Sequence, residues 1–351
     1  MFDIALGIFL FLSPIFFMPI QVGEVNSLQF YIFGTLGNSS YNYQQLLFFY
    51  FGIVALFITA MLSKPQREFN NKWAVYLFIS FCLSVCFHPI GVKVFGGILL
   101  GFLLYYLVTV YVKDYRKLFK FILCASALNT IFALLQFFGI NLIYRATGRI
   151  DGLMCSSVHL GAYQLIVLPV CYAINPLLAL IPITGIILSK SFTAIFLMLC
   201  WSAFMITRKI RSYPIVLSIL TLTVLFIIFN WQSILGKLNV RLMVWLPTIR
   251  EIFNHPFIGY GLKPFRITSS LGTFENPCSI YLQIAWCLGI FALIPIFTIK
   301  TKDKIILASI VLALLVGLEK SIMDFPRLAG TIIVLFGLLN ITKGKTNENQ
   351  V

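Results

Sequence analysis

One polar stretch of this otherwise apolar chain gathers the side chains that could do chemistry. Residues 231–281 carry Lys237, Arg241, Arg250, Lys263 and Arg266 against Glu251 and Glu275. A guanidinium group presents parallel N–H donors that match the oxygens of a phosphate, so clustered arginines suit a phosphate or pyrophosphate group. Ordinary surface charge on a loop is the alternative. The chemistry that this stretch predicts is therefore the binding of an anionic group.

Two helical pieces are expected to position these arginines. Residues 238–246 are amphipathic, and Arg241 and Trp245 share one face because they are four residues apart. Pro247 suits the first turn of a second helix that ends near residue 254. Arg250 lies nine residues after Arg241, so an unbroken helix would direct the two side chains about 180° apart. We therefore expect a break at Pro247 that brings the two arginines together.

Other residues of the stretch each have two interpretations. Trp245 is either part of the site or an aromatic anchor at a membrane interface. The pair His255-Pro256 ends the second helix, because the residue before a proline disfavours the helical conformation. His255 is also a candidate site residue. Gly259 and Gly261 predict either a sharp turn or a close approach of the backbone to a ligand.

Further polar candidates lie upstream. Arg149 and Asp151 fall in a predicted loop, residues 141–152, and Lys190 lies at a predicted turn between helices. Asp151 could orient Arg149, act as a base or form a plain loop salt bridge. His159 is a lone histidine near an apolar run, and we expect it to pack between helices.

The composition identifies the class of protein that must hold these groups. Of the 351 residues, 60% are hydrophobic and 11% are charged, whereas soluble proteins carry about 25% charged residues. Repeated apolar runs near twenty residues predict an all-α, polytopic integral membrane helical bundle. We expect about twelve transmembrane helices in one bundle over residues 1–342, the first of them over 4–20. Residues 231–279 are expected to form one large extracytoplasmic loop, and 343–351 a disordered cytoplasmic tail.

The net charge and the cysteines indicate which partners and ligands we expect for this protein. The formal net charge is +15, which in a membrane protein we interpret as a topology signal rather than as a nucleic-acid footprint. The densest basic loops share one side, so both termini are expected in the cytoplasm. The eight cysteines lie mostly inside apolar runs, which predicts small buried hydrophobes and no disulfide framework or metal site.

The order of these motifs resembles the signature of the O-antigen ligase and polymerase superfamily. The resemblance rests on Arg241-Leu-Met-Val-Trp245, then 255–261, then Phe265, then Cys278-Ser-Ile-Tyr281. Residues 152–155 and 188–194 resemble two further segments of these proteins. The resemblance implies a C-type glycosyltransferase in the bacterial inner membrane. Such enzymes take a glycan from an undecaprenyl pyrophosphate carrier at the outer face and need no metal or other cofactor.

The resemblance also implies roles for individual residues. Arg241 would hold the pyrophosphate leaving group, with Arg149, Lys190 and Arg250 as further ligands. Where ligases have a His-Asn pair, this chain has Cys278-Ser279, and a thiol of pKa about 8.5 is mostly protonated at neutral pH. Glu275 is then the candidate base.

The missing histidine favours a polymerase of lipid-linked repeats over a ligase that transfers glycan to lipid A core or to protein. The expected partners are the lipid-linked glycan, membrane lipid, a chain-length regulator and a flippase, with no nucleic acid. A transporter or flippase is the alternative from another class. It would favour inverted repeats and charged residues inside helices, and neither is evident in the sequence.

Overall fold

The computed structural model describes most of the chain. The described residues are 1–13, 21–25, 28–31, 38–69, 71–87, 92–140, 149–154, 156–210, 213–261, 265, 267–269, 272–274, 277, 279–297, 303–318 and 326–344. Two candidates, Glu275 and Cys278, lie outside them, as do residues 345–351 of the expected tail.

The described residues are mostly helical, as the composition predicts. The first half contains α1 (Phe2–Leu12), α2 (Asn38–Met61), α3 (Lys72–Phe87), α4 (Val92–Tyr111) and α5 (Tyr115–Phe137). The second half contains α6 (Ser157–Ile174), η1 (Pro176–Ala179), α7 (Leu180–Ser189), α8 (Phe192–Ile210), α9 (Tyr213–Phe229), α10 (Trp231–Asn254), α11 (Ile280–Leu288), η2 (Ile290–Leu293), α12 (Ile294–Phe297), α13 (Lys304–Gly317) and α14 (Pro326–Gly344). Two short antiparallel hairpins complete the described elements: β1 (Gln21–Val25) with β2 (Leu28–Tyr31), and β3 (Ile267–Ser269) with β4 (Gly272–Phe274).

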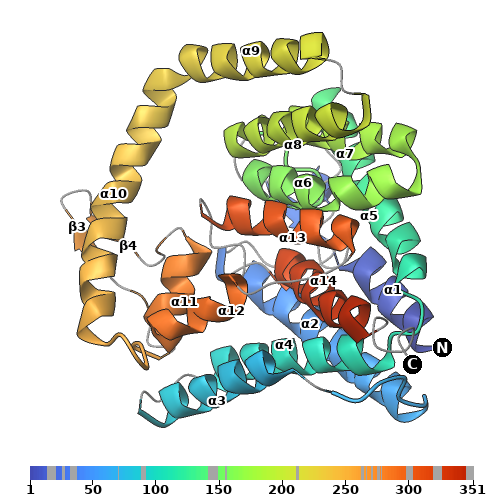
Figure 1. Cartoon of the computed structure of the whole chain (residues 1–351), viewed down its shortest axis with the longest axis vertical. Coiled ribbons are helices and arrows are strands. Elements are labelled where there is room, and N and C mark those ends of the chain that lie inside the picture. Colours follow the sequence, from blue (N-terminus) through green and yellow to red (C-terminus); the bar gives the residue numbers. More distant parts are fainter. Residues whose placement is uncertain are drawn as a thin grey trace.

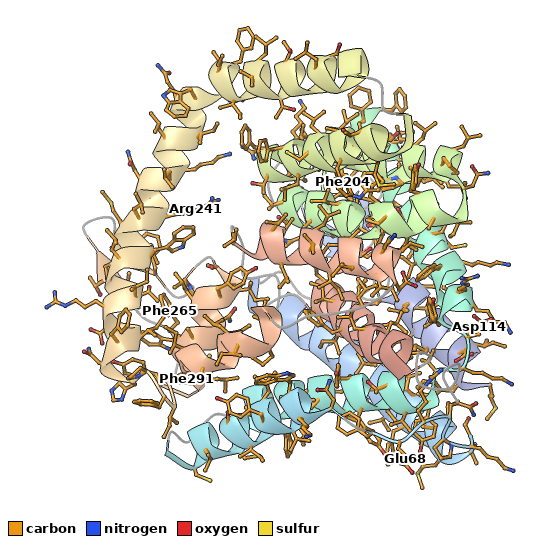
Figure 2. All side chains as sticks on the ribbon, viewed as in Figure 1. Glu68, Asp114, Phe204, Arg241, Phe265 and Phe291 are labelled. Atoms are coloured by element: carbon orange, nitrogen blue, oxygen red, sulfur yellow. The ribbon has the colours of Figure 1, made fainter. Side chains whose placement is uncertain are left out.

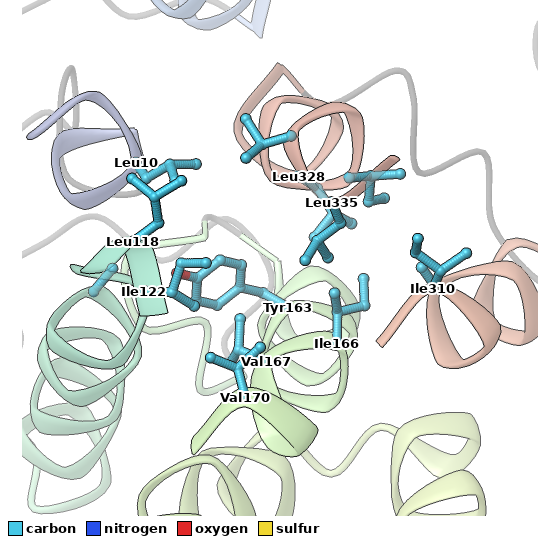
Figure 3. Packing of buried hydrophobic residues seen from close by; sticks show 14 of the residues in the cluster. Leu10, Leu118, Ile122, Tyr163, Ile166, Val167, Val170, Ile310, Leu328 and Leu335 are labelled. Carbon is cyan, nitrogen blue, oxygen red and sulfur yellow. The ribbon is translucent and has the colours of Figure 1, made fainter. Parts of the chain in front are cut away.

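The centre of the bundle is α6, which packs against α5, α7, α8 and α13 (Figure 1). Its Tyr163 is 1% exposed and lies among side chains of several helices (Figure 3). Other labelled members of the same hydrophobic cluster are Leu10 of α1, Leu118 and Ile122 of α5, Ile310 of α13, and Leu328 and Leu335 of α14. Close packing of these large apolar side chains between the helices holds α6 in the bundle.

The expectation of about twelve transmembrane helices is wrong. Within the described residues, two helices, α5 and α6, are long and apolar enough to cross a membrane, or three if α9 and α10 count as one bent span. The other apolar helical segments, such as Tyr50–Met61 within α2 and Leu99–Tyr111 within α4, have 10–17 residues. Helices of that length extend about 15–26 Å, against a hydrocarbon core of about 30 Å. The expectation that both termini lie on the same side of the membrane depended on an even number of about twelve crossings, so it no longer has that support.

The apolar runs are divided for local reasons. Asn175 accepts a hydrogen bond from the N–H of Leu177 and caps η1, so the run after α6 turns at Asn175-Pro176. Gly289 has φ +83° and ends α11, so the run 280–299 is broken there. Hydrophobicity in α6 also serves packing, because 78% of its most apolar window is buried inside the protein. An apolar run in this chain is therefore not always a membrane crossing.

An arm formed by α9 and α10 extends from the bundle. In Figure 1, α9 runs along the top and α10 descends at the left, and α11 and β3 are the main packing partners of α10. The two helices are bent by 76° at their junction. The polar stretch that carries the candidate residues is therefore largely helical.

Candidate functional site

The basic stretch begins with α10, an unbroken helix from Trp231 to Asn254 with Pro247 inside it. The expected break at Pro247 is therefore wrong, although the helix ends before His255-Pro256 as expected. Val244, Thr248 and Ile252 are buried at four-residue intervals on both sides of the proline. Tertiary packing of this face overrides the local preference of proline to interrupt a helix.

Helix continuity separates the two arginines of α10. Arg241 is half-buried and Arg250 is exposed, and nine residues of helix direct them about 180° apart. Figure 2 shows Arg241 on the side of α10 that faces the rest of the bundle. The structure thus does not bring Arg250 to Arg241, and Arg241 is the arginine that faces the bundle.

Trp245 fastens α10 to the segment before α11. Its indole Nε1–H donates to the carbonyl oxygen of Pro277 at 3.0 Å. One turn further on, the Thr248 hydroxyl donates to the carbonyl oxygen of Val244 and satisfies a buried polar group. Trp245 therefore acts here as a positioning residue that joins the two ends of the polar stretch.

The turn after α10 interlocks with the end of α11. Gly259 has φ +70°, and a Cβ at this position would lie 2.5 Å from the carbonyl oxygen of Trp286. A Cβ on Gly289 would lie 2.5 Å from the carbonyl oxygen of Phe257. Two backbone bonds close the contact, from Tyr260 N–H to Trp286 at 2.6 Å and from Ile290 N–H to Pro256 at 2.8 Å. The sharp turn predicted at Gly259 is confirmed, and its close approach is to α11.

Aromatic and polar contacts reinforce this interlock. The Tyr260 ring stacks on the Trp286 ring, with ring centroids 4.4 Å apart. The Phe265 ring packs edge-on against the same Trp286 ring, with centroids 5.0 Å apart. The Tyr260 hydroxyl donates to Glu251 Oε2 at 2.7 Å. Hydrogen bonds from Tyr260 and then Asn254 hold the pKa of Glu251 below its usual range. His255 lies exposed at 4.4 Å from the Tyr260 ring.

A second group of candidates is held by α5. The Gln136 side chain accepts the N–H groups of Asp151 and Gly152 at 3.0 and 2.9 Å. Asn129 Oδ1 accepts the N–H of Leu153 at 3.2 Å. These buried amides fix the segment that follows Arg149, whose side chain is exposed, whereas Asp151 is 1% exposed.

The turn that carries Lys190 meets the first turns of α6 beside that segment. Lys190 has φ +50°, and Ser189 Oγ accepts the N–H of Ser191 at 3.1 Å. A Cβ on Gly161 would lie 2.7 Å from Ser191 Cβ, while a Cβ on Gly152 would lie 3.0 Å from the Leu160 side chain. Since residues 160 and 161 are neighbours on α6, the structure brings the segments of Arg149, Asp151 and Lys190 to one helix end. His159, on the same turn, is buried, which agrees with a packing role.

The candidates therefore form two groups on different helices. Arg241, Trp245, Arg250 and His255 belong to α10 and its end, which pack mainly on α11 and β3. The segments of Arg149, Asp151 and Lys190 surround the start of α6, which packs mainly on α5, α7, α8 and α13. Convergence of Arg241 with Arg149 and Lys190 stays a prediction.

Sequence reasoning missed the residues that position both groups. Gln136 and Asn129 are polar residues within a strongly apolar run, and this placement was the signal that could have identified them. Glu251 was noted only as a charge, although it holds Tyr260. Among the described residues, no cluster of three His, Cys, Asp or Glu side chains could hold a metal ion.

Comparison of the chain with protein-family models and with curated proteins finds no match.

Proposed function

We propose that this protein is a glycosyltransferase of the bacterial inner membrane. Its substrates are oligosaccharide repeats linked to undecaprenyl pyrophosphate, which it polymerises at the outer face of that membrane into a surface polysaccharide. The observation that supports this most is the Trp245–Pro277 hydrogen bond at 3.0 Å. It joins the helix that carries Arg241 to the segment just before α11, so two of the four stretches that carry the family resemblance lie side by side.

The proposed chemistry places a guanidinium group on the departing pyrophosphate. The acceptor hydroxyl oxygen bonds to the anomeric carbon of the donor sugar, and the bond from that carbon to the phosphate oxygen breaks. Its electron pair leaves with the pyrophosphate, whose growing negative charge Arg241 stabilises. The hydroxyl proton passes to a base, for which Glu275 remains the candidate.

The test supplies the purified, reconstituted protein with a lipid-linked repeat and separates the products by length. Arg241→Ala is expected to lower the rate of oligomer formation roughly 10²–10³-fold, the usual effect of removing one charge-stabilising donor. Lys237→Ala is the matched control, because Lys237 is an exposed cation one turn away on the same helix. Equal activity of the two variants would contradict the role of Arg241.

The products also separate the competing functions. Glycan attached to lipid A core or to protein would identify a ligase. Movement of the lipid-linked repeat across the bilayer without chain growth would identify a flippase. Neither product is expected under the proposed polymerisation.

A further inference from the structure

An apolar stripe runs along the whole of α10 and faces away from the protein. Its members recur every three or four residues and are 38–64% exposed: Trp231, Leu235, Leu238, Leu242, Leu246, Ile249 and Phe253. At about 100° per residue they fall within an arc of about 80°. The face that packs on the protein is a different one, since its buried members are Val244, Thr248 and Ile252. A helix that uses one face for packing thus leaves a second, apolar face uncovered.

The charges of α10 are arranged about this stripe. Arg241 lies about 100° to one side of its centre, on the face that packs on the protein, and Arg250 about 80° to the other, exposed side, while Glu251 lies about 180° away. If the stripe pointed down into lipid, both arginines would therefore point sideways, level with the helix axis and above the edges of the stripe. Glu251, held by Tyr260, would face away from the lipid.

The preceding helix also exposes large apolar side chains. Among the described side chains of α9 these are Leu217, Val224, Leu225, Ile228 and Phe229, with exposures between 42% and 82%. α9 and α10 together satisfy the length and hydropathy of a span but are bent by 76°. This geometry fits a membrane-inserted helix followed by one that lies along the membrane surface.

We infer that α10 lies in the plane of the bilayer interface, with its stripe among the acyl chains and with Arg241 and Arg250 at the depth of anionic phospholipid headgroups. Interfacial helices bind through the combination of a narrow apolar face and flanking cations. A partner helix would instead favour flanks of both charge signs, as in coiled coils. The inference rests on the membrane location proposed above and does not depend on glycosyl transfer.

This placement would also fix the depth at which Arg241 works. The pyrophosphate of a lipid-linked glycan lies at headgroup height, because its polyprenyl tail is in the hydrocarbon and its sugar is in water. A helix anchored by its stripe holds a guanidinium at that height without needing the loops around it.

Photocrosslinking in vesicles of phosphatidylethanolamine and phosphatidylglycerol tests the inference on the whole chain. Benzoylphenylalanine replaces Leu242 in one variant and Val240 in the other, and mass spectrometry measures covalent lipid adducts. The pair is matched, because Leu242 is 38% and Val240 43% exposed on the same helix, yet they point about 160° apart. Several-fold more lipid adduct is expected at 242 than at 240.

A second experiment tests the contribution of the positive charge of Arg250. Arg250→Gln is expected to lower the share of phosphatidylglycerol among the adducts at 242, and Lys237→Gln, which lies farther from the stripe, is expected to lower it less. Equal adducts at 240 and 242, or protein–protein adducts at 242 in place of lipid, would overturn the inference. Since crosslinking needs no turnover, lipid adducts without oligomer synthesis would refute the proposed reaction and leave the placement of α10 intact.

Discussion

Two helices of this protein, α6 and α10, use apolar residues for opposite purposes. α6 is surrounded by other helices, and its residues from Ser157 to Cys171 are buried with the exception of half-buried Val158. α10 is buried along one narrow face and exposes an apolar stripe along another. Hydrophobicity alone therefore does not say what covers a helix, because other helices cover α6 and the proposed cover of α10 is lipid.

The two regions also treat polar groups differently. Inside the bundle, the Ser126 hydroxyl donates to Gln164 Oε1 at 2.5 Å, and Gln164 Nε2 donates to Thr130 Oγ1 at 3.1 Å. Three buried side chains thus form hydrogen bonds with one another. In the arm, the polar contacts are isolated hydrogen bonds, one from Trp245 to Pro277 and one from Tyr260 to Glu251. We expect a defect in the bundle to lower the stability of the whole protein, and a defect in the arm to release the arm alone.

The largest effect is expected from Gly259→Val. The new side chain would meet backbone atoms of α11 at 2.5–2.7 Å, at a φ that L residues rarely adopt, so the contact should be lost at a cost of about 3 kcal/mol or more. Limited proteolysis should cut between α10 and α11 while α5–α7 stays protected. Gly272→Val is the control, because Gly272 also has a positive φ but a Cβ added there would meet no atom within 4 Å. Equal protease sensitivity of the two variants would mean that backbone strain, and not docking on α11, decides the outcome.

Gln164→Leu is expected to destabilise the bundle by about 1–3 kcal/mol, because the buried hydroxyl and carbonyl of Ser126 both lose their bond to the Gln164 amide, whereas Thr130 keeps its bond to the Ile181 carbonyl oxygen. The thermal unfolding midpoint in detergent should fall, and protease cleavage of the arm should be unchanged below it. Thr184→Val, which removes an exposed hydroxyl that bonds only its own helix, should change the midpoint little. Local release of the arm in Gln164→Leu would contradict the separation of the two regions.

A smaller and local effect is expected from Trp245→Phe. This variant keeps an aromatic ring and removes the donor to Pro277, which should cost about 0.5–1.5 kcal/mol. Hydrogen exchange should rise in α10 and the segment before α11 and stay unchanged in α6. Trp231→Phe, at the exposed start of the same helix, serves as the control. Faster exchange throughout the bundle would show that the arm is not an independent unit.

The smallest effect is a pH dependence of the arm. The pKa of Glu251 is lowered in the folded protein, so its contribution is present above the unfolded pKa of about 4.3 and is lost as pH falls through the folded value. Tryptophan fluorescence should therefore change at acidic pH as the Tyr260–Trp286 stack loosens. Tyr260→Phe removes the hydroxyl that Glu251 accepts and should abolish this step; a persistent step would assign it to another group.

The sequence by itself determined where most helices lie and where several of them end. The apolar runs 192–207, 213–230 and 305–318 of the sequence correspond to α8, α9 and α13, because long apolar segments need internal backbone hydrogen bonds. His255-Pro256 ended α10 as predicted, since this signal is local. The same local patterns placed Arg241 and Trp245 on one polar helix.

Only the tertiary structure decided what each helix face touches. Packing on α11 kept α10 continuous through Pro247, and the backbone of α11 explains why Gly259 must lack a side chain. The amides of Gln136 and Gln164 found partners on segments far away in sequence, and the number of helices long enough to span a membrane depended on where the chain turns. These outcomes depend on contacts between distant segments, whereas helix ends depend on neighbours within one or two turns.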